Sequence, residues 1–270
     1  LGVAALVIVM SVMNGFRAEL LDKIVGLNGH AVVQGYGGRL NDWQDILKET
    51  RRMDGVVAAS PLIEQPLLIN FDGRVEAVLV RGTDAPDIAA LKDKTVLGSV
   101  AELKAGASKV ALGSRLAQNL GVRIGDKITI INPAGRATPF GTVPREILYE
   151  VSAIVEIGVY DYDKAFVIMP IRDAQLLLLL GDQVGMIEVT TRDADQVREI
   201  LAPLEQKLRG QAVVNDWRTI NASLFEALAV ERVAMFIVLS IIILVAVFNI
   251  LSSLIMLVRA KTRDIAILRT

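Results

Sequence analysis

The sequence predicts an α+β domain placed between transmembrane α-helices, and three features of its 270 residues support this prediction. The hydrophobic content of 53% and the mean hydropathy of +0.47 are high for a soluble protein. The excess lies at the ends, since residues 1–13 are almost wholly apolar and residues 233–258 contain no charged residue. Between the ends, apolar runs of strand length alternate with segments of helical periodicity.

The first segment, residues 1–27, is interpreted as the end of a first transmembrane helix and a stalk. Its thirteen leading apolar residues span only ~20 Å as a helix, less than the ~30 Å hydrocarbon core. A secretory signal peptide is the alternative, but no basic region precedes the apolar run and no cleavage site follows it. Because the sequence also stops inside a helical pattern, at residues 268–270, we expect a chain cut at both ends.

The next region, residues 28–82, has the order strand, helix, strand, strand. A strand is expected at 31–34 and a helix at 41–53. Asp72 and Gly73 stand between two apolar runs, which is typical of a hairpin with a two-residue turn.

Residues 186–220 repeat the order strand, helix, strand. A strand is expected at 186–191, a helix at 193–208 that Pro203 kinks or restarts, and a strand at 211–216. The two regions together predict a split ferredoxin-like layer with helices on one face of a mostly antiparallel sheet.

Between these halves, residues 83–185 form an insertion. Its apolar runs predict several short strands and two short helices, so it is best described as β-rich. The Pro/Gly-rich stretch 133–144 predicts a loop.

The last apolar segment, residues 221–258, has no helix breaker. If residues 222–258 are wholly helical, they form a rod of ~55 Å, longer than the bilayer requires. The segment that follows, 259–270, has a net charge of +3 from Arg259, Lys261, Arg263 and Arg269 against Asp264. Short basic flanks stay in the cytoplasm, which places the domain outside the inner membrane.

No catalytic or metal site is predicted. The chain has one histidine, no cysteine and no recognisable Ser, His and acid signature. His30 is expected to be a structural hydrogen-bonding residue. Asp161 and Asp163 predict a solvated turn, because the glycine and the distant glutamate of a calcium loop are missing. No P-loop motif occurs, so any ATP must bind to another chain, and a net charge near zero gives no nucleic-acid footprint.

Four sequence blocks carry a family resemblance. They are VIVMSVMNGF at 7–16, DWRTINASLFEALAVER at 216–232, VAVFNILSSLIMLV at 245–258 and KTRDIAILRT at 261–270. Together they resemble the lipoprotein-releasing permeases of the LolC/LolE kind, within the wider group of ABC permeases that includes MacB and FtsX. The resemblance covers the whole chain. It implies a MacB-like periplasmic core domain in a four-helix permease, of which this chain lacks the start and the third and fourth helices.

The resemblance assigns a carrier-binding hook to the loop at 136–146. The hook residues are Thr138, Pro139, Phe140, Gly141, Thr142, Val143, Pro144 and Arg145. LolE-type chains lack this Thr-Pro-x-Gly-x-x-Pro sequence, so the chain is LolC-like here and the implied partner is a soluble LolA-like carrier. Phe140 at the loop tip would be an exposed apolar anchor, and the prolines leave few backbone donors. The alternative is a strand connection that merely contains turn residues.

The resemblance also implies a segment that docks on a LolD-like ABC ATPase. This coupling segment consists of Arg263, Asp264, Ile265, Ala266, Ile267, Leu268 and Arg269. Alternatively, its basic residues only fix the topology. A lipid-facing cavity for acyl chains is expected where apolar and flexible side chains of both membrane helices meet. Its residues are Met10, Met13, Phe16, Phe225, Leu228, Met235 and Phe236.

The function implied is that of a permease subunit, not an enzyme, in the bacterial inner membrane. It would be a multi-pass protein with a large periplasmic domain and no cofactor of its own, with ATP and Mg²⁺ bound by the partner ATPase. Together with a second permease copy or paralogue, it would release acylated lipoproteins and pass them to the carrier. The alternatives are a MacB-like efflux permease, an FtsX-like regulatory permease and a membrane-anchored periplasmic binding or sensor module.

Overall fold

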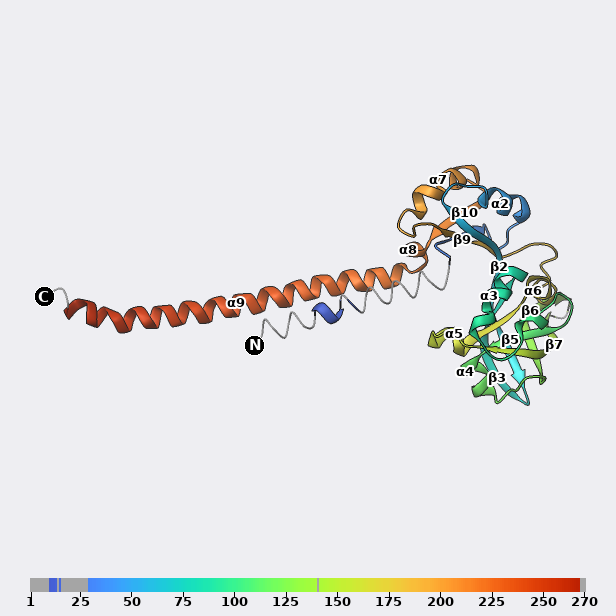
Figure 1. Cartoon of the computed structure of the whole chain (residues 1–270), viewed down its shortest axis with the longest axis horizontal. Helices are drawn as coiled ribbons and strands as arrows, with labels where there is room; N and C mark the ends of the chain where they lie inside the picture. The colour runs from blue at the N-terminus through green and yellow to red at the C-terminus, as the bar shows by residue number, and fades with distance from the viewer. Residues whose placement is uncertain (1–9, 14, 16–28, 140, 268–270) are drawn as a thin grey trace. The chain divides into compact units, whose positions relative to one another are not determined.

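A computed structural model describes residues 10–13, 15, 29–139 and 141–267. The chain divides into two units, one within Asn28–Trp217 and the other made of Leu1–Leu27 with Arg218–Thr270. The first unit is a mixed α+β domain, and the second contains the long helix that carries the apolar C-terminal segment (Figure 1).

Two strand–helix–strand units of the domain form one antiparallel layer. They consist of β1 (Ala31–Gly35), α2 (Trp43–Thr50) and the start of β2 (Val56–Phe71), and of β9 (Met186–Thr191), α7 (Val197–Lys207) and β10 (Ala212–Asp216). The strand order β10-β1-β9-β2, with each neighbouring pair antiparallel, is that of a ferredoxin-like fold. The predicted split ferredoxin-like layer is therefore confirmed.

The core of this layer follows from the alternation of buried and half-buried residues along its strands. Val33 and Ile187 lie opposite each other and are fully buried, and α2 and α7 add buried residues such as Leu47 and Leu201. Pro203 lies inside α7, which continues through it as one helix, so the prediction that the helix restarts there is wrong. Since this helix contributes its buried residues to the core, packing outweighs the missing N–H of the proline.

Strand β2 has 16 residues and belongs to two parts of the domain. Its first half pairs with β9 as far as Leu62, and its second half, Leu62–Phe71, pairs with β3 (Arg74–Thr83). The turn between β2 and β3 has Asp72 at φ 49° and Gly73 at φ 78°, so the predicted two-residue hairpin is confirmed. The change from one part to the other thus falls inside β2, not at residue 82 as the sequence predicts.

The inserted strands close a barrel. After β3, pairing runs through β8 (Phe166–Pro170), β5 (Lys109–Gly113), β7 (Gly141–Val155) and β6 (Lys127–Thr138), and β6 pairs back with β2. The short strand β4 (Thr95–Gly98) pairs with the end of β7. Val80, Leu112, Ile130 and Val167 are fully buried. This region also contains four α-helices and two 3₁₀ helices, namely α3 (Ala85–Ala90), η1 (Leu91–Lys94), η2 (Val100–Glu102), α4 (Ser114–Leu120), α5 (Tyr160–Ala165) and α6 (Ile171–Leu178).

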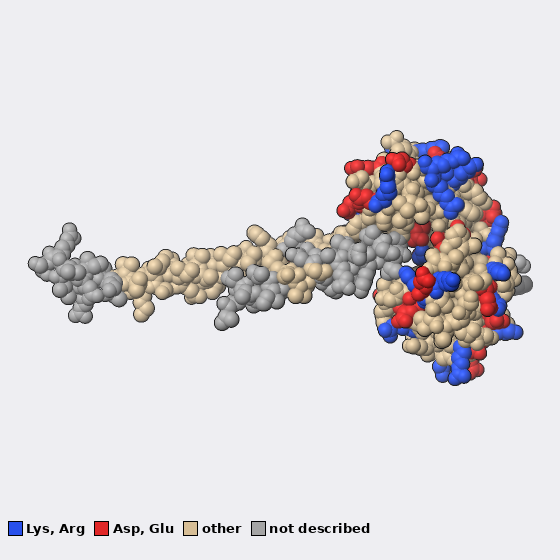
Figure 2. All heavy atoms as spheres, in the orientation of Figure 1, with Lys and Arg blue, Asp and Glu red and all other residues tan. Residues whose placement is uncertain are grey.

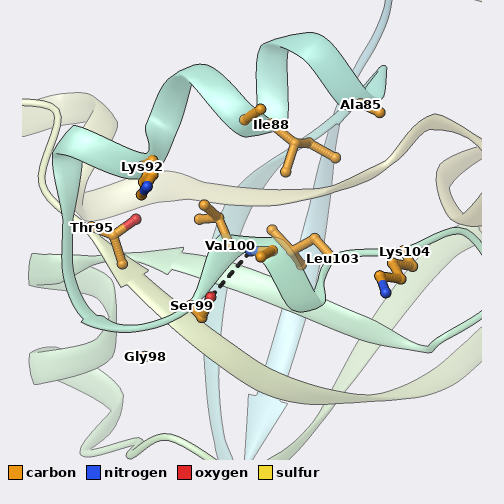
Figure 3. A pocket seen from close by; sticks show the side chains of 11 residues that line it. Ala85, Ile88, Lys92, Thr95, Gly98, Ser99, Val100, Leu103 and Lys104 are labelled. Atoms are coloured by element: carbon orange, nitrogen blue, oxygen red, sulfur yellow. Dashed lines mark hydrogen bonds between the residues drawn. The ribbon is translucent and has the colours of Figure 1, made fainter.

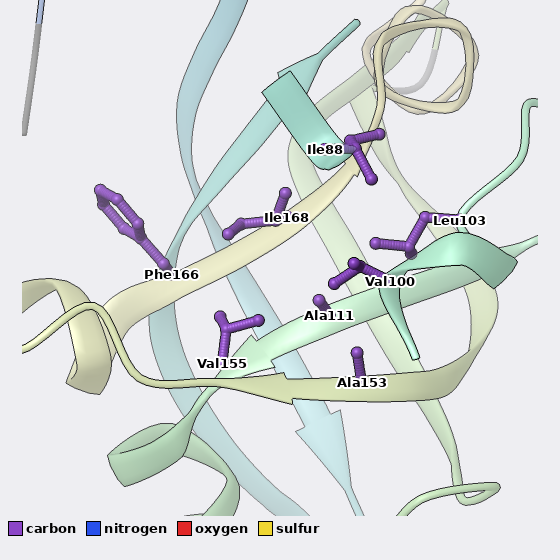
Figure 4. Close-up of a cluster of buried hydrophobic side chains, with 8 residues drawn as sticks. All are labelled: Ile88, Val100, Leu103, Ala111, Ala153, Val155, Phe166 and Ile168. Atoms are coloured by element: carbon purple, nitrogen blue, oxygen red, sulfur yellow. The ribbon is translucent and has the colours of Figure 1, made fainter. Parts of the chain in front are cut away.

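A second cluster of buried side chains lies between these strands and the short helices α3 and η2 (Figure 4). It contains Ile88, Val100, Leu103, Ala111, Ala153, Val155, Phe166 and Ile168. Strands β5 and β8 are consequently buried along almost their whole length, which is why they appear in the sequence as continuous apolar runs.

The Asp161–Tyr162–Asp163 segment forms helix α5 instead of the predicted solvated turn. The side chain of Asp163 is 2% exposed and accepts hydrogen bonds from the backbone N–H groups of Ile157 (2.7 Å) and Gly158 (3.1 Å). This carboxylate therefore satisfies buried backbone donors and belongs to the core.

In the second unit, α9 (Ala222–Ile267) has 46 residues, which corresponds to ~69 Å. It follows the short helix α8 (Trp217–Ile220) and continues beyond residue 258, where the rod was expected to end. Its segment Phe225–Arg259 is long and apolar enough to cross a membrane, with a mean hydropathy of 3.0 in its most apolar window. Figure 2 shows charged side chains of both signs over the domain, whereas α9 has none along its apolar stretch.

Candidate functional site

The predicted hook is the end of a β-hairpin. Strands β6 and β7 remain paired as far as Thr138 and Gly141, where the sequence predicts an open loop over 133–144. Only Pro139 and residue 140 lie between the strands, and Phe140 itself is outside the described residues. The loop prediction is wrong because Pro133 and Pro144 lie at a single irregularity of the pairing, beyond which the ladder resumes, and only Pro139 lies in the turn.

This irregularity is a bulge. Asn132 pairs with Arg145, and the next pair is Arg136 with Val143, so three residues of β6 oppose Pro144 alone. A proline has no N–H to give to the ladder, and Pro133 and Pro144 both fall at this break. A bulge bends and twists a strand pair, so it sets the direction of the hairpin end.

Gly135 makes the bulge possible. A Cβ at this position would lie 2.3 Å from the carbonyl oxygen of Val143, closer than any real contact. The side chain of Asn132, which is 6% exposed, accepts a hydrogen bond from the N–H of Ala134 at 3.1 Å and fixes the start of the bulge. The sequence Asn-Pro-Ala-Gly thus encodes a defined bend.

Beyond the bulge the two strands have no other partner among the described residues. Strand β2 pairs with β6 only at 129–131, and β5 pairs with β7 only from Glu150. Residues 132–138 and 141–149 therefore form a two-stranded arm, and no described strand pairs with the outer edge of 132–138 or of 142–149. Pro139, Thr142 and Pro144 are exposed at its end, and the side chain of Val143 is 55% exposed. Free strand edges and exposed apolar side chains are features of protein-binding surfaces.

The base of the arm is buried. Tyr149 is 3% exposed, and burial together with Asp173 raises its pKa to about 12, against the opposing effect of Arg145. Burial also raises the pKa of Asp173, although the N–H of Gly106 donates to its Oδ1 at 3.0 Å. Asp173 Oδ2 and Arg145 Nε are buried and have no hydrogen-bond partner among the described residues. Tyr149 is consequently neutral at physiological pH and anchors the arm by packing.

A half-buried ionic triad joins the ferredoxin-like layer to the barrel. Arg81 of β3 binds Glu64 of β2 (Nη1 to Oε1, 2.8 Å) and Glu188 of β9 (Nη2 to Oε2, 2.6 Å). The other oxygen of Glu188 accepts a hydrogen bond from the N–H of Gly29 at 2.8 Å. Burial raises the pKa of Glu64, whereas the charge of Arg81 lowers it. The triad fixes three strands at the point where the two parts of the domain meet.

The two ends of the domain are fastened together. Ala31 pairs with Asp216, and the carbonyl oxygen of His30 accepts a hydrogen bond from the backbone N–H of Trp217 at 2.9 Å. The His30 ring is within hydrogen-bond distance of the Thr191 hydroxyl, at 2.9 Å, and burial lowers its pKa. These contacts agree with the structural role predicted for His30. The chain enters and leaves the domain at the same place.

The predicted lipid-facing residues of α9 differ in their exposure. Phe225, Leu228 and Met235 are half-buried and share a stripe with further half-buried positions at 231, 239 and 242. Phe236 is 69% exposed. In the first segment Met10 is exposed and Met13 half-buried, whereas Phe16 lies outside the described residues.

The predicted coupling segment is the end of α9. Arg263, Asp264, Ile265, Ala266 and Ile267 continue the helix, and Leu268 and Arg269 lie outside the described residues. Among the residues that the structure describes, no three His, Cys, Asp or Glu side chains are grouped as metal ligands would be.

Comparisons with known proteins agree with this architecture. The model of the MacB-like periplasmic core domain family matches residues 1–207. The lipoprotein-releasing system transmembrane protein LolC of Neisseria meningitidis is 36% identical, that of Xylella fastidiosa 33% and that of Haemophilus influenzae 32%, in each case over 100% of this chain. The chain covers 66%, 66% and 67% of these proteins, respectively, so it spans about two thirds of their length.

Proposed function

Because the chain belongs to the LolC/LolE family of lipoprotein-releasing ABC transporter permeases, we propose that it frees outer-membrane lipoproteins from the inner membrane and delivers them to a soluble periplasmic carrier. In this proposal the subunit is not itself the enzyme. ATPase subunits with bound ATP and Mg²⁺ supply the energy, and a second permease copy or paralogue completes the membrane part.

One observation supports delivery to a carrier above the others, namely the arm formed by residues 132–138 and 141–149. It extends past the barrel strands that flank it, no described strand pairs with its outer edges, and its end is exposed. A soluble carrier needs such a surface, because it must recognise the permease without entering the membrane. The bulge at Gly135 gives the arm a fixed direction, which lowers the entropic cost of binding.

The test compares two valines of the same barrel that are equally exposed. Val143 lies on the arm and is 55% exposed, and Val75 lies near the β2–β3 turn and is 54% exposed. We expect Val143→Asp to reduce capture of a purified LolA-like carrier by the permease complex at least tenfold, because it places a charge in an apolar contact. Val75→Asp should leave capture unchanged. Equal capture by both variants would show that the arm does not bind the carrier.

The membrane part of the proposal concerns α9. Acyl chains of the lipoprotein would contact the half-buried stripe that contains Phe225, Leu228 and Met235, where unbranched and aromatic side chains adapt to different chains. Residues 263–269 would dock on the ATPase. The domain would lie in the periplasm, and the helix would transmit the ATPase movement to it.

A further inference from the structure

The barrel carries a groove that lies apart from the carrier-binding arm. It has a volume of about 510 Å³ and lies between α3 with η1 on one side and β4 with η2 on the other (Figure 3). Most of its lining is apolar and comes from Ala85, Ile88, Ala89, Val100, Ala101 and Leu103. This volume falls in the range of about 300–1,000 Å³ that is usual for binding pockets.

The floor of the groove is part of the rigid core. Ile88, Val100 and Leu103 are 4–6% exposed and belong to the cluster that packs on β5, β7 and β8 (Figure 4). The hydroxyl of Ser99 accepts a hydrogen bond from the N–H of Ala101 at 3.3 Å, which fixes the start of η2. The groove is therefore preformed, and an occupant need not order it.

The groove has a cation at each end. Lys92 and Lys104 lie at opposite ends of the apolar lining in Figure 3, and both are exposed. Neither lysine has an ion-pair partner within the described part of the chain. Glu102, the acid closest in sequence to Lys104, is bound by Lys109 at 2.5 Å. Asp93, beside Lys92, is exposed and forms no ion pair with a described residue.

From this arrangement we propose that the groove binds a short protein segment in which apolar residues are flanked by an acidic residue at each end. An apolar middle with a cation at both ends is complementary to such a segment. A lipid with one anionic head would satisfy only one of the lysines. Val96 and Leu97 of β4, 55% and 56% exposed, extend the apolar surface at the margin. The inference is independent of the carrier-binding role of the arm.

The binding test uses defined peptides and the full chain of residues 1–270 in lipid nanodiscs. Fluorescent peptides carry two to four leucine or valine residues between two glutamates, and a matched series replaces the glutamates with lysines. We expect saturable binding of at least one glutamate peptide by fluorescence anisotropy. The matching lysine peptide should bind at least tenfold more weakly.

Two groups of variants locate the site. Lys92→Glu with Lys104→Glu should weaken binding at least tenfold, because attraction becomes repulsion at both ends. Lys48→Glu with Lys127→Glu changes the net charge equally at exposed lysines outside the groove lining and should leave binding unchanged. Ala89→Trp fills the groove and should abolish binding without a change of charge. Circular dichroism checks that each variant is folded.

Three results would overturn the proposal. The first is equal weakening by both lysine pairs, which indicates non-specific attraction. The second is undiminished binding by Ala89→Trp. The third is that no peptide binds but palmitate binds, and that palmitate binding depends on Lys92 and Lys104. This result would make the groove a lipid site.

Discussion

Asp173 lies under the base of the β6–β7 arm with a side chain that hardly reaches water. It is 4% exposed, and one of its two oxygens has no hydrogen-bond partner in the described part of the chain. A buried carboxylate of this kind costs free energy in its charged form, and its raised pKa expresses that cost. The residue therefore makes the base of the arm sensitive to pH.

We expect Asp173→Asn to become more stable relative to the unsubstituted chain as the pH rises. The ordinary pKa of 3.8 applies to the unfolded chain, and burial raises the pKa in the folded state. The folded state of the unsubstituted chain then holds the Asp173 proton more tightly than the unfolded state does. The stability that this proton contributes is fully present below pH 3.8 and is lost as the pH rises through the pKa of the folded state. Asparagine keeps an acceptor for Gly106 and carries no charge.

Urea unfolding followed by tryptophan fluorescence from about pH 3 to about pH 7 measures the difference in stability between Asp173→Asn and the unsubstituted chain. A pH-independent difference, or an equal trend for the exposed Asp93→Asn, would contradict this expectation.

Gly135 permits the bulge that sets the direction of the arm. Gly135→Val places a branched side chain where a single Cβ would already meet the Val143 carbonyl oxygen at 2.3 Å. The two strands must separate at the bulge, which should cost about 1–3 kcal/mol of stability and reduce carrier capture. The matched control is Ala134→Val, because Ala134 is next to Gly135 in the sequence but is exposed. Thermal unfolding and capture are measured for both, and similar behaviour of the two variants would rule out a special role for the glycine.

At the scale of elements, the triad of Arg81, Glu64 and Glu188 joins β2, β3 and β9. Arg81→Met leaves two half-buried carboxylates without their cation, so we expect a loss of about 1–3 kcal/mol in the free energy of unfolding. Arg172→Met removes an ion pair with Asp182 whose side chains are 64% and 61% exposed, and should cost at most about 1 kcal/mol. Denaturant titrations measure the free energy of unfolding of both variants. Equal losses would mean that the triad contributes no more to stability than an exposed ion pair does.

The sequence is informative about elements whose partners are close in the chain. The order of apolar runs predicts both halves of the ferredoxin-like layer, and Asp72-Gly73 predicts the β2–β3 hairpin of the barrel, because local turn chemistry and periodicity suffice there. Closure of the barrel depends on pairing of β6 with β2, which lie about 60 residues apart along the chain, and no local sequence pattern predicts this pairing.

The sequence does not predict the arm, because Pro133 and Pro144 are typical of loops and only the structure shows that they lie in a bulge. The groove has no signal in the sequence, since its alanines and lysines are typical of any exposed helix.

At the scale of the whole molecule, α9 is one helix from Ala222 to Ile267, so it spans the apolar segment and the described part of the coupling segment, residues 263–267, without a break. If this helix transmits force, a break at the C-terminal end of its apolar segment should separate ATP hydrolysis from release. We expect Val258→Pro, which costs about 3 kcal/mol of local helix stability, to abolish lipoprotein release by the reconstituted complex while ATP hydrolysis continues. Val258→Ala keeps the helix and should retain release. Undiminished release by the proline variant would exclude a rigid-rod mechanism.

The dual membership of β2 also determines how the domain can fold. The pairings of β2 with β9 and with β6 join residues that are far apart in the sequence, and such contacts form slowly. A barrel cut out at residue 83 would lose the strand half that closes it, and the ferredoxin-like layer would keep an unsatisfied edge. Layer and barrel should therefore unfold in a single cooperative transition. During synthesis all the barrel strands leave the ribosome by Pro170, whereas the ferredoxin-like layer is complete only after β10 has emerged.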